Sequence, residues 1–94
     1  MSRQLVLKND CGTLEYEECM GEYFIHLTLH KWSHKLYREY LTLFNDWCIS
    51  TGKRAVFCLI PEDDVKLQKF EMMFGFHTIH VEEGQRLMVK EVGE

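Results

Sequence analysis

The sequence predicts an α+β domain in which a mixed central sheet combines with two helices, in the order β-β-β-α-β-α-β-β. Three patterns support this fold class. Apolar and polar residues alternate at 14–17 and 25–30, as they do in half-buried strands. From Leu36 to Cys48, apolar residues recur every three or four positions, which is typical of an amphipathic helix. The run AVFCLI at 55–60 is apolar throughout and indicates a strand buried on both faces.

The first part of the chain is expected to form three antiparallel strands. The first lies at 5–8, and a turn at 9–12 leads into the second, around 14–17. A further turn at 20–22 leads into the third strand, at 23–30. Because the connections are short, neighbouring strands are expected to pair as an antiparallel meander.

A long helix and a buried strand follow the meander. Ser33 suits the N-cap and Gly52 suits the end of the helix, so the helix is expected to span 34–51. The buried strand at 55–60 comes directly after this helix. It is therefore expected to lie parallel to the strand at 23–30, joined to it by a right-handed crossover.

The last part of the chain predicts a second helix and a hairpin. Asp63 or Asp64 can cap a helix with the sequence VKLQKFEMMF, and Gly75 ends it. Two strands, at 77–81 and 86–92, then flank a turn and form a hairpin that closes the sheet.

The composition indicates one folded domain spanning residues 1–94. Hydrophobic residues make up 46% of the chain, which is enough for a core and too many for a disordered segment. Eleven lysines and arginines against fifteen aspartates and glutamates give a net charge of −4, which disfavours nucleic acid as a partner. No apolar run approaches ~18 residues, and the N-terminal apolar stretch is too short for a signal peptide. We therefore expect no membrane partner and a cytoplasmic location.

The cysteines and histidines offer little sign of a metal site. No two cysteines form a C-x-x-C pair, so Cys48 and Cys58 are expected to be reduced core residues. His26 and His30 would share one strand face with His34 just beyond, an arrangement that could hold a metal or relay protons. The favoured interpretation is a half-exposed polar strand face, because no carboxylate or cysteine stands nearby at ligand spacing.

The element order, together with the string KFEMMFGF, resembles the GNAT acetyltransferase superfamily. In that family a meander leads into a long helix, a buried strand, a short helix ending in Gly-Phe, and a terminal hairpin. Gly75 and Phe76 stand where the family has this Gly-Phe. The family's first strand and the two helices after it have no counterpart here, so the resemblance is to a truncated GNAT core.

The resemblance implies an acetyl-CoA site, but the phosphate-binding loop of the family is missing. The family holds the pyrophosphate with backbone N–H groups of a glycine-rich loop at the start of the long helix. The corresponding junction here is HKWSHKLYREY, which contains no glycine and is shorter. The side chains of Lys31, Ser33, His34 and Lys35 are the remaining candidates for holding phosphate there, helped by the helix N-terminus.

The resemblance also points to candidate catalytic groups. The family often places a tyrosine, which protonates the leaving thiolate, four residues before the glycine, and Glu71 stands at this position. Glu71 could act as an acid only if burial raised its pKa strongly, and a solvated helix residue is the favoured interpretation. The family's general base is often a meander glutamate, which makes Glu15, Glu17 and Glu18 candidates by type. Exposed surface charge is again the favoured interpretation.

Two functional hypotheses follow. The first is a GNAT-fold protein without acetyltransferase activity that acts as a protein-binding or structural accessory module, with Trp32 and Tyr37 as candidate partner contacts and no cofactor. The second is a divergent acetyl-CoA-dependent N-acetyltransferase that modifies a protein or a small amine. Binding of acetyl-CoA, and a gap between the two parallel strands, would favour the second.

The resemblance and the edge strands also suggest a source and an oligomeric state. Compact proteins with this core and no phosphate loop look like bacteriophage accessory proteins, which would place the chain in the host cytoplasm or the virion. The edge strands lead us to expect a homodimer. The local basic stretch at 31–38 is too small to outweigh the acidic total for nucleic acid binding.

Overall fold

A computed structural model describes residues 3–8, 10, 12–31 and 33–92. Trp32, one of the expected partner contacts, lies outside the described residues. The elements follow the order predicted from the sequence: β1 (Gln4–Lys8), β2 (Gly12–Cys19), β3 (Glu22–Leu29), α1 (His34–Thr51), β4 (Ala55–Pro61), α2 (Val65–Met73), β5 (His77–Glu82) and β6 (Gln85–Glu91).

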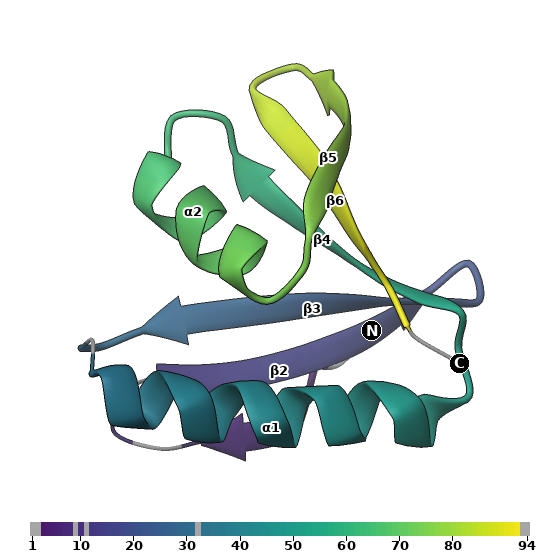
Figure 1. The fold of residues 1–94 in the computed structure, drawn as a ribbon. Coiled ribbons are helices and arrows are strands. Elements are labelled where there is room, and N and C mark those ends of the chain that lie inside the picture. The colour runs from purple at the N-terminus through teal and green to yellow at the C-terminus, as the bar shows by residue number, and fades with distance from the viewer. Residues whose placement is uncertain (1–2, 9, 11, 32, 93–94) are drawn as a thin grey trace.

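All six strands belong to one mixed sheet, with the strand order β1-β2-β3-β4-β6-β5 (Figure 1). The β1–β2, β2–β3, β4–β6 and β5–β6 pairs are antiparallel. The β3–β4 pair is parallel, as the crossover through a long helix predicted. The sheet therefore consists of an N-terminal half, β1-β2-β3, and a C-terminal half, β4-β6-β5, that meet at β3 and β4.

Side-chain and backbone caps explain where the helices begin and end. The Ser33 hydroxyl accepts a hydrogen bond from the Leu36 amide at 3.4 Å, and Gly52 ends α1 with a left-handed φ of 72°. Both roles were predicted from the sequence. In α2 the cap is Asp64 and not Asp63, because the Asp64 carboxylate accepts from the Leu67 amide at 3.1 Å.

Both helices pack on the same face of the sheet. The ring of Phe74, which caps the end of α2, lies 5.9 Å from the ring of Tyr40 and 5.5 Å from that of Phe44, both on α1. Trp47 of α1 contacts Tyr16 on β2 at 5.1 Å between ring centroids. This follows from topology, because both crossovers run in the same direction across the sheet and right-handed crossovers then share one face.

The core lies between these helices and the sheet. It contains Leu14, Ile25, Tyr40, Phe44, Cys48, Val56, Cys58, Ile60, Phe70, Phe74, Phe76 and Met88, all of which are buried. The burial of Cys48 and Cys58 confirms the prediction that they are core residues, and both are free thiols. None of the described helices is long and apolar enough to cross a membrane.

The opposite face of the sheet has no helix over it among the described residues. Phe24 of β3 and Phe57 of β4 stack on this face, with ring centroids 5.5 Å apart. Leu59, two residues further along β4, is 55% exposed. We call this surface the open face.

Candidate functional site

The two central strands form a fork. Phe24 and Phe57 are the one registered pair between β3 and β4, whereas β2–β3 and β4–β6 are paired along their lengths. Beyond Phe24 and Phe57 the two strands diverge toward their C-terminal ends (Figure 1). Backbone groups on the facing edges of β3 and β4 therefore do not pair with each other beyond this point.

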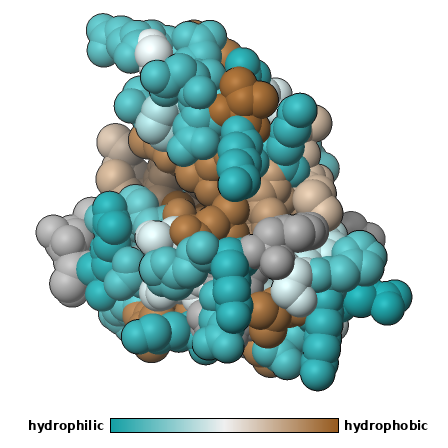
Figure 2. Space-filling model, turned by 90° about the vertical axis from the view of Figure 1, so that its left-hand side faces the viewer, coloured by the Kyte–Doolittle hydropathy of each residue, from teal (hydrophilic) through white to brown (hydrophobic). Residues whose placement is uncertain are grey.

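A cavity of about 240 Å³ lies where the end of β3 faces α2. It is lined by Leu29, His30, Lys31, Lys66, Lys69, Phe70 and Met73. We call it the fork cavity. Figure 2 shows this side of the molecule as a hollow with hydrophobic residues in its depth and hydrophilic residues around it. A second hollow, of about 320 Å³, adjoins it and shares Leu29 and Lys66.

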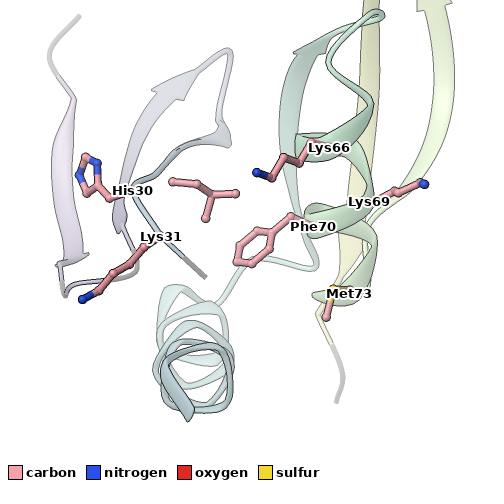
Figure 3. Close-up of a pocket in the computed structure, with 7 residues that line it drawn as sticks. His30, Lys31, Lys66, Lys69, Phe70 and Met73 are labelled. Carbon is pink, nitrogen blue, oxygen red and sulfur yellow. The ribbon is translucent and has the colours of Figure 1, made fainter. Parts of the chain in front are cut away.

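The side chains around the fork cavity divide by direction. Lys66 and Phe70 point from α2 toward the end of β3, whereas the Lys69 ammonium and the His30 ring point away from the cavity (Figure 3). Lys31 has its ammonium 3.8 Å from an Asp10 carboxylate oxygen. Among the described residues, Lys66 has no ion-pair partner, so its positive charge is available to a ligand.

Of the four residues predicted from the sequence to contact phosphate, one lines the fork cavity. Lys31 was a predicted phosphate contact and does line the cavity. Ser33, His34 and Lys35 are not among the residues that line it, and the Ser33 side chain is engaged as the cap of α1. Lys66, on α2, was not anticipated. Its position in the first turn of a helix capped by Asp64 could be predicted from the sequence, but the placement of α2 opposite the end of β3 could not.

Tyr37 connects the two helices beside the cavity. Its hydroxyl donates a hydrogen bond to the Met73 carbonyl at 2.8 Å, and its ring stacks on Phe74 at 5.5 Å. The His34 ring lies 6.4 Å from the Tyr37 ring. Tyr37 is half-buried, and its contacts within the chain give it a structural role in holding α2 against α1.

Glu71 is buried, so the expectation of a solvated helix residue is wrong. Its side chain is 1% exposed and lies against Cys58 of β4, the residue after Phe57. Burial raises the pKa of the Glu71 carboxyl to about 7, although a hydrogen bond from the Cys58 thiol opposes this. Burial, followed by the neighbouring Glu71 charge, raises the Cys58 pKa far above its ordinary value. The Glu71 Oε1 atom has no hydrogen-bond partner among the described residues.

Glu17 and His26 form a pair on the open face. The Glu17 Oε1 atom lies 2.5 Å from the His26 Nε2 atom, and the two side chains are 26% and 28% exposed. His26 is two residues beyond Phe24 on β3. Within the part of the chain that the structure describes, no three His, Cys, Asp or Glu side chains gather as a metal site, so His26, His30 and His34 do not converge.

Comparisons with known proteins agree with this architecture at the level of the fold. No family model and no curated protein matches the sequence. Among solved structures, the chain is similar to one described as "Putative GnaT-family acetyltransferase from Bordetella pertussis", with a TM-score of 0.66 and 13% sequence identity. The match covers 84% of this chain and 56% of that one, so this chain spans little more than half of its length. The chain thus has the GNAT-like α+β fold that its sequence predicted.

Proposed function

We propose that this chain binds the phosphopantetheine arm of an acyl-CoA in the fork between β3 and β4. The observation that carries the proposal is the divergence of the two strands beyond Phe24 and Phe57, with a cavity of about 240 Å³ at its mouth. Strand edges present N–H and C=O groups that an extended, amide-containing chain can pair with. Pantetheine is such a chain, with two amide groups.

The lining of the fork cavity suits the two chemical parts of this ligand. Leu29, Phe70 and Met73 offer an apolar wall to the methylene and methyl groups of pantetheine. Lys66 points toward the end of β3, so its ammonium group can reach a phosphate (Figure 3). Lys31 lies at the rim, but its side chain extends away from the cavity and its ammonium lies 3.8 Å from an Asp10 carboxylate oxygen. The fit is therefore to an extended arm with an anionic end.

Phosphate recognition is expected to depend on side chains more than on backbone. The connection between β3 and α1, residues 30–33, contains no glycine, so the backbone N–H groups cannot easily all turn toward a phosphate. Lysine ammonium groups act as mobile point charges and give a less directed site. Such binding should weaken with added salt, since exposed charges are screened.

The geometry supports binding better than acyl transfer. Glu71 has the position that the family gives to a proton donor, and a pKa of about 7 would suit that role. Its carboxyl group is enclosed against Cys58 and is not among the groups that line the fork cavity. A thiolate in the cavity would have no direct path to it. N-acetyl transfer to a protein or small amine is therefore the second candidate, favoured only by the pKa of Glu71.

Calorimetric titration tests the proposal. Acetyl-CoA should give saturable binding, and Lys66→Ala should weaken it roughly three- to tenfold, which corresponds to about 1 kcal/mol. The matched control is Arg54→Ala, which removes one exposed positive charge at the other end of α1. S-acetylpantetheine lacks phosphate, so its affinity for Lys66→Ala should equal its affinity for the native protein. Absence of saturable binding, or an equal loss in both variants, would contradict the proposal.

A further inference from the structure

The open face carries an apolar patch that crosses the junction of the two half-sheets. Strand register places the half-buried Phe24 and Phe57 and the buried Val89 in one row. The next row holds the exposed Leu59 and the half-buried Leu87. Residues paired in register point to the same side of a sheet. Because Cys58, the neighbour of Phe57, contacts α2 through Glu71, the Phe57 row faces away from the helices.

Carboxylates flank this patch on both sides. On the N-terminal half-sheet, Glu15, Glu17 and Glu22 belong to the open face, since they register with or alternate beside His26 and Phe24. On the C-terminal half-sheet, Glu82 and Glu91 register with Gln85 and Ala55 on the same side. We call the apolar rows and these carboxylates together the acid-flanked patch.

Few cations neutralise these carboxylates. Arg3 lies 3.9 Å from Glu15, His26 pairs with Glu17, and His80 lies 2.8 Å from Glu82. The carboxylates Glu22 and Glu91 have no ion-pair partner among the described residues. The patch is therefore apolar in the middle and negative at its borders.

We propose that the acid-flanked patch binds a cationic, amphipathic helical segment of a protein partner. The patch crosses β3, β4 and β6, a width of about 10 Å at the usual strand spacing, which matches the diameter of one helix. The apolar side chains of such a helix would cover Phe57 and Leu59, and its lysines or arginines would reach the flanking carboxylates. Complementary charge of this kind accelerates association and selects the partner.

Charge disfavours the other occupants. A second copy placed face to face would bring carboxylates against carboxylates, which is repulsive across an interface. The phosphates of a nucleic acid or an anionic lipid surface would meet the same repulsion. This proposal does not depend on ligand binding in the fork, because Leu59 is not among the residues that line the fork cavity.

Fluorescence anisotropy with a designed helical peptide tests the proposal. The probe is a labelled Leu–Lys amphipathic helix, and a Leu–Glu peptide of the same pattern is its charge-reversed counterpart. The Leu–Lys peptide should bind saturably and the Leu–Glu peptide should not. Leu59→Asn should weaken binding at least fivefold, whereas Leu43→Asn, at a similarly exposed leucine on α1, should leave it unchanged.

Charge and folding controls complete the experiment. Glu91→Gln should weaken peptide binding about twofold, and Glu62→Gln, an exposed carboxylate before α2, should not. Equal losses in Leu59→Asn and Leu43→Asn would overturn the proposal. So would a dimer in light scattering that Leu59→Asn abolishes, or preferential binding of anionic vesicles or single-stranded DNA. Leu59→Asn should bind acetyl-CoA as the native protein does. A loss of peptide binding in this variant can then be distinguished from a loss of ligand binding in the fork.

Discussion

The two faces of the sheet are made by the same strands and have opposite chemistry. The covered face packs aromatic rings of α1 and α2 over the core and encloses the carboxyl group of Glu71. The open face shows an apolar centre with carboxylates at its borders. Because side chains alternate along a strand, each residue of β4 belongs to one environment and its neighbour to the other. Cys58 is buried and Leu59 is exposed for this reason.

This difference indicates where stability and recognition reside. Burial of large apolar side chains supplies most of the free energy of folding, so the covered face should dominate stability. An exposed apolar group contributes little to folding but can contribute to binding a partner. Substitutions of the same type on the two faces should therefore separate the two contributions.

The largest expected difference is between two phenylalanines. Phe44→Ala removes a fully buried ring of α1 that packs against Phe74 and Phe76, and it should lower the free energy of unfolding by about 3–5 kcal/mol. Phe57→Ala removes a half-buried ring from the open face and should lower it by about 1–2 kcal/mol. Urea denaturation followed by circular dichroism measures both. Equal effects would mean that a further segment or partner covers the open face.

The next effect concerns pH and the buried Glu71. Its pKa in the folded protein is about 7, above the ordinary value of 4.5, so the folded state holds the proton more tightly than the unfolded chain. The contribution of Glu71 to the free energy of unfolding is fully present below pH 4.5. It falls as the pH rises from 4.5 toward 7 and is lost above pH 7. The loss should amount to roughly 3 kcal/mol. In Glu71→Gln this part of the pH dependence should vanish, as urea denaturation between pH 4.5 and 8 would show.

The control for this pH effect is Glu62→Gln, which removes an exposed carboxylate and should retain the native pH dependence. If Glu71→Gln also retained it, Glu71 would be ionised in the folded protein across this range. The surrounding helix would then have to admit water to the carboxyl group.

The order of elements was accessible from the sequence because it depends on local patterns. The alternation at 25–30, the helical spacing from Leu36 to Cys48 and the caps Ser33 and Gly52 each act over a few residues. The direction of β4 then followed from the handedness of crossovers. These rules do not involve the detailed packing of one element on another.

The candidate site depends on how the elements pack together, and it was therefore harder to predict from the sequence. The divergence of β3 and β4 depends on how each half-sheet packs against the helices. No proline or glycine near Leu29 predicts it from the sequence. Lys66 became a cavity residue only once α2 was placed opposite the end of β3. The burial of Glu71 contradicted the usual exposure of carboxylates, and only its contact with Cys58 explains its environment.

The smallest expected effect comes from a glutamate on the open face. Glu17→Gln replaces the carboxylate that pairs with His26 at 2.5 Å, and it should lower the free energy of unfolding at pH 7 by less than about 1 kcal/mol, because both side chains are partly exposed to water. Glu18→Gln changes the neighbouring exposed side chain, which faces the other way along β2, and should have no measurable effect. A loss above about 2 kcal/mol in Glu17→Gln would contradict this expectation. It would mean that water is excluded from the pair, and hence that the open face is covered in solution.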